Sequence, residues 1–154
     1  MLDRSSADTN SAVRRLPQTS KTKIVYLVNP NSPTGTIYSL KEIKEIANFL
    51  AGKGAILIVD EAYIEYTNLG SATTLLNKCN NVVVTRTFSK AYGLANFRVG
   101  YLISNKENIK WIEKLIPDFP INTISENAAI AALKDQKYLK GVIKKIATCK
   151  KSLV

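Results

Sequence analysis

The chain of 154 residues is long enough for one domain with a hydrophobic core, and 45% of its residues are hydrophobic. Its formal net charge is +10, but the basic excess lies in the two ends of the chain, and the part between them is nearly balanced. A solvated basic surface explains this pattern better than a nucleic-acid interface, so we expect no nucleic-acid partner. Histidine is absent, which excludes nucleophiles activated by a histidine base and most zinc sites; we expect no metal.

The sequence also argues against a membrane or secreted protein. No stretch approaches 18 consecutive apolar residues, and the first residues do not resemble a signal peptide. The two cysteines, Cys79 and Cys149, are far apart and lack metal-binding spacing, which is typical of reduced thiols. We therefore expect a cytoplasmic protein with no membrane contact.

The first third of the chain predicts a strand, a helix and a second strand after a loose polar tail at residues 1–20. The β-branched run 23–29 predicts a buried strand that ends at a Pro/Gly-rich turn. Ser39 followed by Glu42 forms a capping-box pattern, and apolar residues then recur at helical spacing up to a pair of glycines. The continuous apolar run 55–60 predicts a strand that is covered on both faces.

The next segments favour a parallel sheet with one antiparallel strand. A short helix is expected at 71–78 and a third strand at 82–87, and this alternation is typical of parallel strands joined by crossovers. The strand expected at 98–103 follows after only about ten residues, which is short for a crossover, so we expect it to be antiparallel. Three further helices are expected, at 105–116, 125–134 and about 136–150.

A polar motif follows each of the three expected parallel strands: "NPNSPTG" after the first, "DEAY" at the end of the second and "TFSK" at the end of the third. Because the carboxyl ends of parallel strands meet at one edge of a sheet, we expect these motifs to lie together. Each motif alone has an ordinary explanation, namely a turn, a helix cap and a surface lysine. Their combination is harder to explain without a function.

The residue types in these motifs suit one cofactor. A lysine screened by apolar neighbours can act as a Schiff-base nucleophile, and hydroxyls with an arginine can bind a phosphate. An aspartate at the adjacent strand end suits a cationic ring nitrogen. Together these groups predict a site for pyridoxal 5'-phosphate, in which the aspartate keeps the ring nitrogen protonated.

Three segments in this order, "NPNSPTGT" (29–36), "VDEAYIEY" (59–66) and "TRTFSKAYGLANFRVGY" (85–101), resemble the class I and II aminotransferases. Within that family the chain is most similar to the histidinol-phosphate aminotransferases. The resemblance implies an α/β fold: a fragment of the large domain of the aspartate-aminotransferase-like fold (fold type I), with three parallel strands, one antiparallel strand and flanking helices. Residues 21–154 would form part of this cofactor-binding domain, and the full-length family member would be a homodimer.

The resemblance also implies roles for individual residues. Lys90 would form the Schiff base with pyridoxal 5'-phosphate and then move a proton between substrate and cofactor. Asp60 would pair with the pyridine nitrogen, and Tyr63 would hydrogen-bond the phenolate oxygen of the ring. Ser32 stands where the family most often has asparagine; its shorter side chain could weaken the contact with that oxygen by about 0.5–1.5 kcal/mol.

The phosphate group of the cofactor would be held by Thr87, Ser89 and Arg98, according to the same resemblance. For Tyr92, Gly93 and Gly100 we favour a structural role in shaping the turn over a catalytic one.

The implied reaction is amino transfer between a small-molecule amino donor and a 2-oxo acid, most closely histidinol phosphate and 2-oxoglutarate in histidine biosynthesis. Alternatives are another class I or II aminotransferase, a threonine-phosphate decarboxylase-like enzyme, or a non-catalytic remnant that acts as an interaction module. Family members are more than twice as long, and their upstream stacking aromatic and C-terminal small domain have no counterpart here. We therefore expect little or no turnover from these 154 residues alone.

Overall fold

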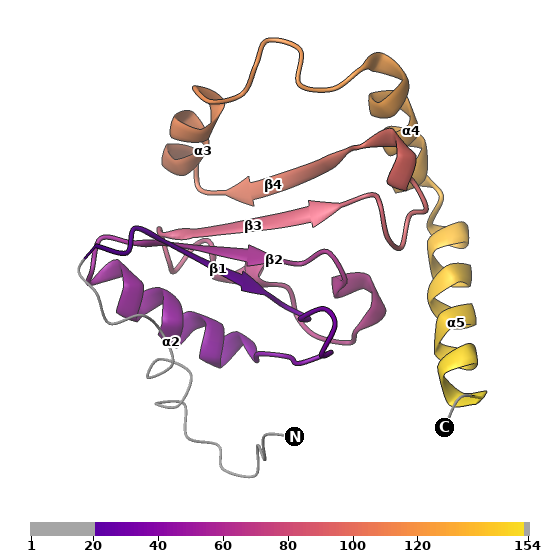
Figure 1. The fold of residues 1–154 in the computed structure, drawn as a ribbon, viewed down its shortest axis with the longest axis horizontal. Coiled ribbons are helices and arrows are strands. Elements are labelled where there is room, and N and C mark those ends of the chain that lie inside the picture. Colours follow the sequence, from indigo (N-terminus) through magenta and orange to yellow (C-terminus); the bar gives the residue numbers. More distant parts are fainter. Residues whose placement is uncertain (1–20, 153–154) are drawn as a thin grey trace.

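The computed structural model describes residues 21–152, so the polar tail expected at residues 1–20 lies outside the described part. Its centre is a four-stranded sheet in the order β1-β2-β3-β4 (Figure 1). The first three strands are parallel and β4 is antiparallel to β3, which confirms the mixed sheet predicted from the sequence. The strands are β1 (Ile24–Val28), β2 (Ile56–Asp60), β3 (Val82–Thr87) and β4 (Gly100–Ser104).

Helix α2 (Leu40–Ala51) covers one face of the sheet and begins at the predicted capping box. The Ser39 hydroxyl accepts a hydrogen bond from the Glu42 backbone N–H at 3.3 Å, and the Glu42 carboxylate accepts one from the Ser39 N–H at 2.7 Å. The apolar side of α2 packs on the side chains of β2 and β3 that point to this face of the sheet. Together these side chains form the main core. Its fully buried members include Ile43, Ile46, Leu50, Leu57, Val59, Val82 and Val84.

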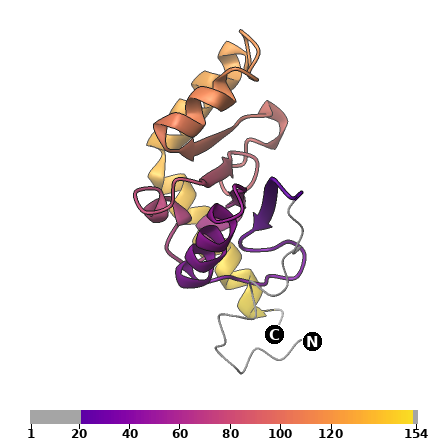
Figure 2. The ribbon, with the colours of Figure 1, turned by 90° about the vertical axis from the view of Figure 1, so that its left-hand side faces the viewer.

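The opposite face of the sheet is open along β1 and β2, and we call it the open face. Its residues Ile24 and Tyr26 are 59% and 57% exposed, and Ile58 and Asp60 are only half-buried. Figure 2 shows α2 to one side of the strands, and no described element lies against β1 on the other. The expectation that the strand at 55–60 is covered on both faces therefore holds for one face only.

A short 3₁₀ helix, η2 (Ala72–Leu75), replaces the helix expected at 71–78. Its hydroxyl side chains bond to the local backbone instead of leaving it to continue an α-helix. The Ser71 hydroxyl accepts from the Thr73 N–H at 3.1 Å, and the Thr74 hydroxyl donates to the Ser71 carbonyl at 2.9 Å.

The last third of the chain contains α3 (Lys106–Glu113), α4 (Thr123–Lys134) and α5 (Gln136–Ser152), in agreement with the three expected helices. Helix α5 runs past the edge of the sheet at which β1, β2 and β3 end (Figure 1). A second cluster of buried side chains joins it to the loop after β3; its members are Phe88, Ala91, Tyr92, Val99, Ala129 and Leu139. Within residues 21–152, no helix is long and apolar enough to cross a membrane.

Candidate functional site

The carboxyl ends of β1, β2 and β3 bring the three sequence motifs to one edge of the sheet. Ser32 lies in the turn after β1, and Asp60 is the last residue of β2. Tyr63 follows three residues after Asp60. Thr87 ends β3, and Lys90 lies in the turn that leads away from it. The sheet therefore places residues that are far apart in the sequence on one edge, as the parallel topology predicts.

Lys90 and Ser32 both contact the Tyr63 side chain. The Lys90 Nζ lies 5.2 Å from the centroid of the Tyr63 ring. A hydrogen bond with Lys90, followed in importance by one with Ser32, lowers the pKa of Tyr63 from its ordinary value, because both donors stabilise the phenolate. An amine, a phenol and a hydroxyl therefore lie near one another, at the ends of three different strands.

Asp60 points to the open face of the sheet, where each of its carboxylate oxygens accepts one hydrogen bond. Oδ1 accepts from the Ala62 backbone N–H at 2.9 Å, and Oδ2 accepts from the Tyr26 hydroxyl. This contact is the largest cause of the raised pKa of Tyr26, followed by burial and by the carboxylate charge. The sequence analysis did not identify Tyr26. The strand register would have identified it. Tyr26 lies two residues before Val28, which pairs with Asp60, so Tyr26 and Asp60 lie on the same face of the sheet.

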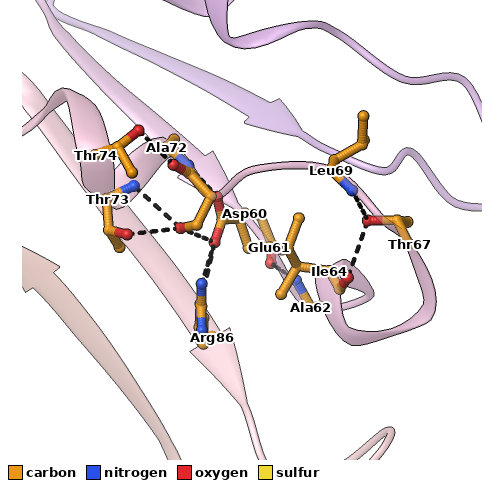
Figure 3. Close-up of polar contacts among 11 residues, drawn as sticks. Asp60, Glu61, Ala62, Ile64, Thr67, Leu69, Ala72, Thr73, Thr74 and Arg86 are labelled. Atoms are coloured by element: carbon orange, nitrogen blue, oxygen red, sulfur yellow. Dashed lines mark hydrogen bonds and ion pairs between the residues drawn. The ribbon is translucent and has the colours of Figure 1, made fainter. Parts of the chain in front are cut away.

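Glu61, the next residue, points to the opposite face and is only 1% exposed. Its Oε2 accepts from Arg86 Nε at 3.0 Å and Nη2 at 2.9 Å, and from the Ser71 hydroxyl at 2.8 Å. Its Oε1 accepts from the Ala72 N–H at 2.6 Å. Figure 3 shows Arg86 extending from β3 toward this carboxylate. The network joins the ends of β2 and β3 to η2 beneath the candidate site.

The sequence analysis also missed the Glu61–Arg86 ion pair. A signal was present, because an arginine inside the apolar strand run "VVVTRT" needs an acidic partner when it is buried. Arg86 also carries a hydrogen bond with Tyr101, and both partners help to raise its pKa against the lowering effect of burial.

The three residues predicted to bind a phosphate are arranged unequally. The Thr87 hydroxyl accepts from the Ser89 N–H at 3.0 Å, so these two hydroxyl residues lie together at the turn. Arg98 is exposed and has a left-handed backbone (φ 53°), and its Nη1 donates to the Ala95 carbonyl at 3.0 Å. The left-handed residue also explains why β4 begins at Gly100 and not at residue 98.

The residues Tyr92, Gly93 and Gly100 shape the turn, as expected. Tyr92 is 9% exposed, and its ring centroid lies 5.0 Å from that of Phe88 in the second core. Gly93 has φ 72°, a conformation that favours glycine. A Cβ atom at Gly100 would lie 2.7 Å from the Arg86 carbonyl oxygen, so only glycine allows β4 to approach β3 this closely.

The described residues contain no group of three or more acidic, histidine or cysteine side chains that could hold a metal ion.

Comparison with known proteins identifies the family. The family model of aminotransferase class I and II matches residues 5–154, and the chain belongs to this family. A histidinol-phosphate aminotransferase from Hydrogenovibrio crunogenus is 42% identical over 128 residues, which is 81% of this chain and 34% of that protein. A dihydroxyacetone phosphate transaminase from Campylobacter jejuni is 41% identical over 132 residues, which is 86% of this chain and 35% of that protein. The chain spans about a third of the length of these relatives.

Solved structures agree with this assignment. The histidinol-phosphate aminotransferase from Sinorhizobium meliloti, in complex with pyridoxal-5'-phosphate, superposes with a TM-score of 0.75 at 39% identity, over 81% of this chain and 34% of that one. The L-threonine-O-3-phosphate decarboxylase from Porphyromonas gingivalis shares the fold, with a TM-score of 0.72 at 22% identity over 85% of this chain and 40% of that one. The mixed sheet and its flanking helices are those of the fold type I aminotransferases.

Proposed function

We propose that the protein serves pyridoxal-phosphate-dependent amino transfer, with Lys90 as the residue that bonds the cofactor. The observation that carries this proposal is the contact of Lys90 with Tyr63 at the strand edge that also carries Asp60. Membership of the class I and II aminotransferases supports it, as does a relative of known structure that holds this cofactor.

The side chains at the edge fit the groups of the cofactor. The Asp60 carboxylate suits the ring nitrogen, and the Tyr63 and Ser32 hydroxyls suit the phenolate oxygen. Thr87 and Ser89 supply hydroxyls for the phosphate. Arg98 would join them by exchanging the Ala95 carbonyl for a phosphate oxygen, because a charged acceptor forms a stronger hydrogen bond than a neutral one.

When it is bound, pyridoxal phosphate supplies an electron sink for the bond electrons released at the α-carbon of an amino acid. The protein side chains prepare that chemistry. The Asp60 carboxylate would pair with the ring nitrogen and help it to keep its proton. Tyr63 would orient the Lys90 amine by a hydrogen bond, and this amine would take and return the proton at the substrate α-carbon.

For the substrates we propose histidinol phosphate as amino donor and 2-oxoglutarate as acceptor, in histidine biosynthesis. Several relatives at about 40% identity or above carry the name histidinol-phosphate aminotransferase. The dihydroxyacetone phosphate transaminase supports a second candidate, a class I or II aminotransferase that acts on a different phosphate ester. The names of both relatives contain a phosphorylated small molecule, so we propose a phosphorylated substrate in either case. We further propose that the protein acts in the cytoplasm without a nucleic-acid partner, and that its full-length form is a homodimer.

Reductive labelling tests the role of Lys90. The purified chain is incubated with pyridoxal phosphate, reduced with borohydride and analysed by peptide mapping. We expect Lys90 to carry more label than Lys78 and the lysines of α5, and the Lys90→Ala variant to lose this selective label. Equal labelling of all lysines would contradict the proposal.

The same reaction distinguishes the two donors. Preincubation with a reactive amino donor should deplete the Lys90 label, because the donor would compete with the Lys90 amine for the cofactor. In a completed enzyme, in which the remaining segments of a full-length relative extend this chain, we expect histidinol phosphate to deplete the label faster than the amine that corresponds to dihydroxyacetone phosphate. The reverse order would favour the second candidate.

A further inference from the structure

We propose that Tyr26 is a positioning residue for Asp60, whose carboxylate it holds directed over the open face of the sheet. The proposal rests on the proposed function, because the partner of the carboxylate would be the ring nitrogen of pyridoxal phosphate. It adds a residue that lies outside the three motifs.

The strand register explains how the two side chains meet. Tyr26 pairs with Ile58 and Val28 pairs with Asp60, so Tyr26 and Asp60 lie on the same face, two residues apart along the parallel strands. A tyrosine side chain is long enough to cross this offset, and its hydroxyl reaches Asp60 Oδ2. The Ala62 N–H holds Oδ1 at 2.9 Å. The carboxylate therefore cannot rotate without breaking one of the two contacts.

The two hydrogen bonds also affect where a shared proton resides. A donor that bonds to a carboxylate stabilises its ionised form relative to the neutral acid. A pyridine nitrogen that faces the carboxylate competes with it for one proton, so a stabilised carboxylate leaves that proton on the nitrogen. The hydrogen bond with Asp60 is also the largest cause of the raised pKa of Tyr26, because it holds the proton on the phenol.

Tyr26 has no large role in the core that would explain this contact. Its side chain is 57% exposed and lies on the edge strand β1. Ile24 is 59% exposed on the same face of the same strand, two residues farther from the carboxyl end of β1. Ile24→Ala is thus a matched control for any general disturbance of β1.

The first experiment needs no cofactor. Tyrosine ring carbons are labelled with 13C, the Tyr26 signal is assigned with Tyr26→Phe, and the phenol is titrated by NMR. In Asp60→Ala the Tyr26 phenol should titrate at lower pH than in the wild-type chain, because it loses both its acceptor and the nearby negative charge. Titration at the same pH in both proteins would overturn the proposed pairing.

The second experiment uses pyridoxal phosphate that carries 15N in the ring. Tyr26→Phe should weaken its binding by roughly 3- to 10-fold, the equivalent of one hydrogen bond. The ring-nitrogen signal should move toward that of the unprotonated form, and Asp60→Ala should move it further. Ile24→Ala should match the wild-type chain in affinity and signal.

The outcomes separate this proposal from the proposed function. Wild-type affinity and an unchanged ring-nitrogen signal in Tyr26→Phe would overturn the positioning role, even if the phenol titration shows the pairing. Failure of the wild-type chain to bind pyridoxal phosphate would contradict the proposed function instead. The phenol titration then decides by itself whether Tyr26 holds Asp60.

Discussion

Glu61 is the most heavily bonded side chain beneath the candidate site. Its carboxylate is 1% exposed and accepts hydrogen bonds from Arg86, Ser71 and Ala72. A buried ion pair contributes little net stability, but removing one partner leaves an uncompensated charge in a medium that solvates it poorly. The pair should therefore be costly to break from either side.

Arg86→Met tests this expectation. The variant should lose about 3–5 kcal/mol of unfolding free energy, measured by urea denaturation, because Glu61 stays buried without its cation. Arg98→Met removes an exposed arginine and should change the unfolding free energy by about 0.5 kcal/mol or less. Equal stability of the two variants would show that water reaches Glu61 and replaces the arginine.

The contact between Lys90 and Tyr63 predicts a titration effect. Lys90→Met removes the largest cause of the lowered pKa of Tyr63, so that pKa should rise toward its ordinary value. Tyrosine NMR measures the shift, with the signal assigned by Tyr63→Phe. Lys78→Met is the control and should leave the Tyr63 titration in place. A Tyr63 that titrates alike in all three proteins would mean that the Lys90 side chain lies elsewhere in solution.

At the scale of elements, two glycines have opposite roles. Gly100 opens β4, where an added Cβ atom would lie 2.7 Å from the Arg86 carbonyl oxygen of β3. Gly141 lies within α5, where an added Cβ atom would meet nothing within 4 Å. The first glycine permits a close approach of two strands, whereas the second only adds backbone entropy to the unfolded chain.

The same substitution should therefore have opposite signs at the two positions. Gly100→Ala should lower the unfolding free energy by roughly 1–3 kcal/mol, because the backbone of β3 cannot move away without breaking its pairing. Gly141→Ala should raise it by about 0.5–1 kcal/mol. Thermal or urea unfolding of both variants checks the signs. Destabilisation at Gly141 would indicate that α5 packs more closely there than the structure shows.

Elements whose signals are local were predictable from the sequence. The capping box at Ser39 and the helical spacing after it define α2 without help from the rest of the chain. The short connection before β4 was enough to predict its antiparallel direction. The 3₁₀ helix η2 was not predicted, because its local hydroxyl bonds act together with bonds from the Ser71 hydroxyl and the Ala72 N–H to Glu61, a residue ten or eleven positions away.

The candidate site was likewise predictable only in part. Motif order on parallel strands was sufficient to bring Lys90, Tyr63 and Ser32 together. The partners of the two neighbouring carboxylates come from other strands, and they require the register between the strands. That register is a tertiary property, so only the structure could assign Tyr26 to Asp60 and Arg86 to Glu61.

At the scale of the whole molecule, the chain leaves much apolar surface uncovered. The open face exposes Ile24 and Tyr26, and the segment around α3 exposes Trp111 (68%), Leu115 (84%) and Phe119 (92%). Exposed apolar surface of this extent is typical of interfaces or of surfaces that pack against further structure. The relatives it matches are about three times as long.

We therefore expect the 154-residue chain to show little or no catalytic turnover. The described residues offer the phosphate only the turn around Thr87 and Ser89, with Arg98 nearby, and each missing charge-assisted contact weakens binding by about 1.5–3 kcal/mol. The assay follows glutamate formation with excess pyridoxal phosphate, histidinol phosphate and 2-oxoglutarate. Lys90→Ala gives the background rate. Turnover close to that of a full-length relative would contradict the expectation.

The opposite orientation of Asp60 and Glu61 also limits which changes in chain length β2 can accept. Side chains alternate along a strand, so deletion of one residue from β2 turns every later side chain to the other face. Such a deletion would carry Glu61 to the open face and turn Asp60 toward Arg86, although both residues would still be present. A substitution in β2 that conserves side-chain volume can be tolerated. A single insertion or deletion, in contrast, would turn Asp60 and Glu61 to each other's face of the sheet. The spacing between the strand and its motif is therefore as constrained as the identity of either acid.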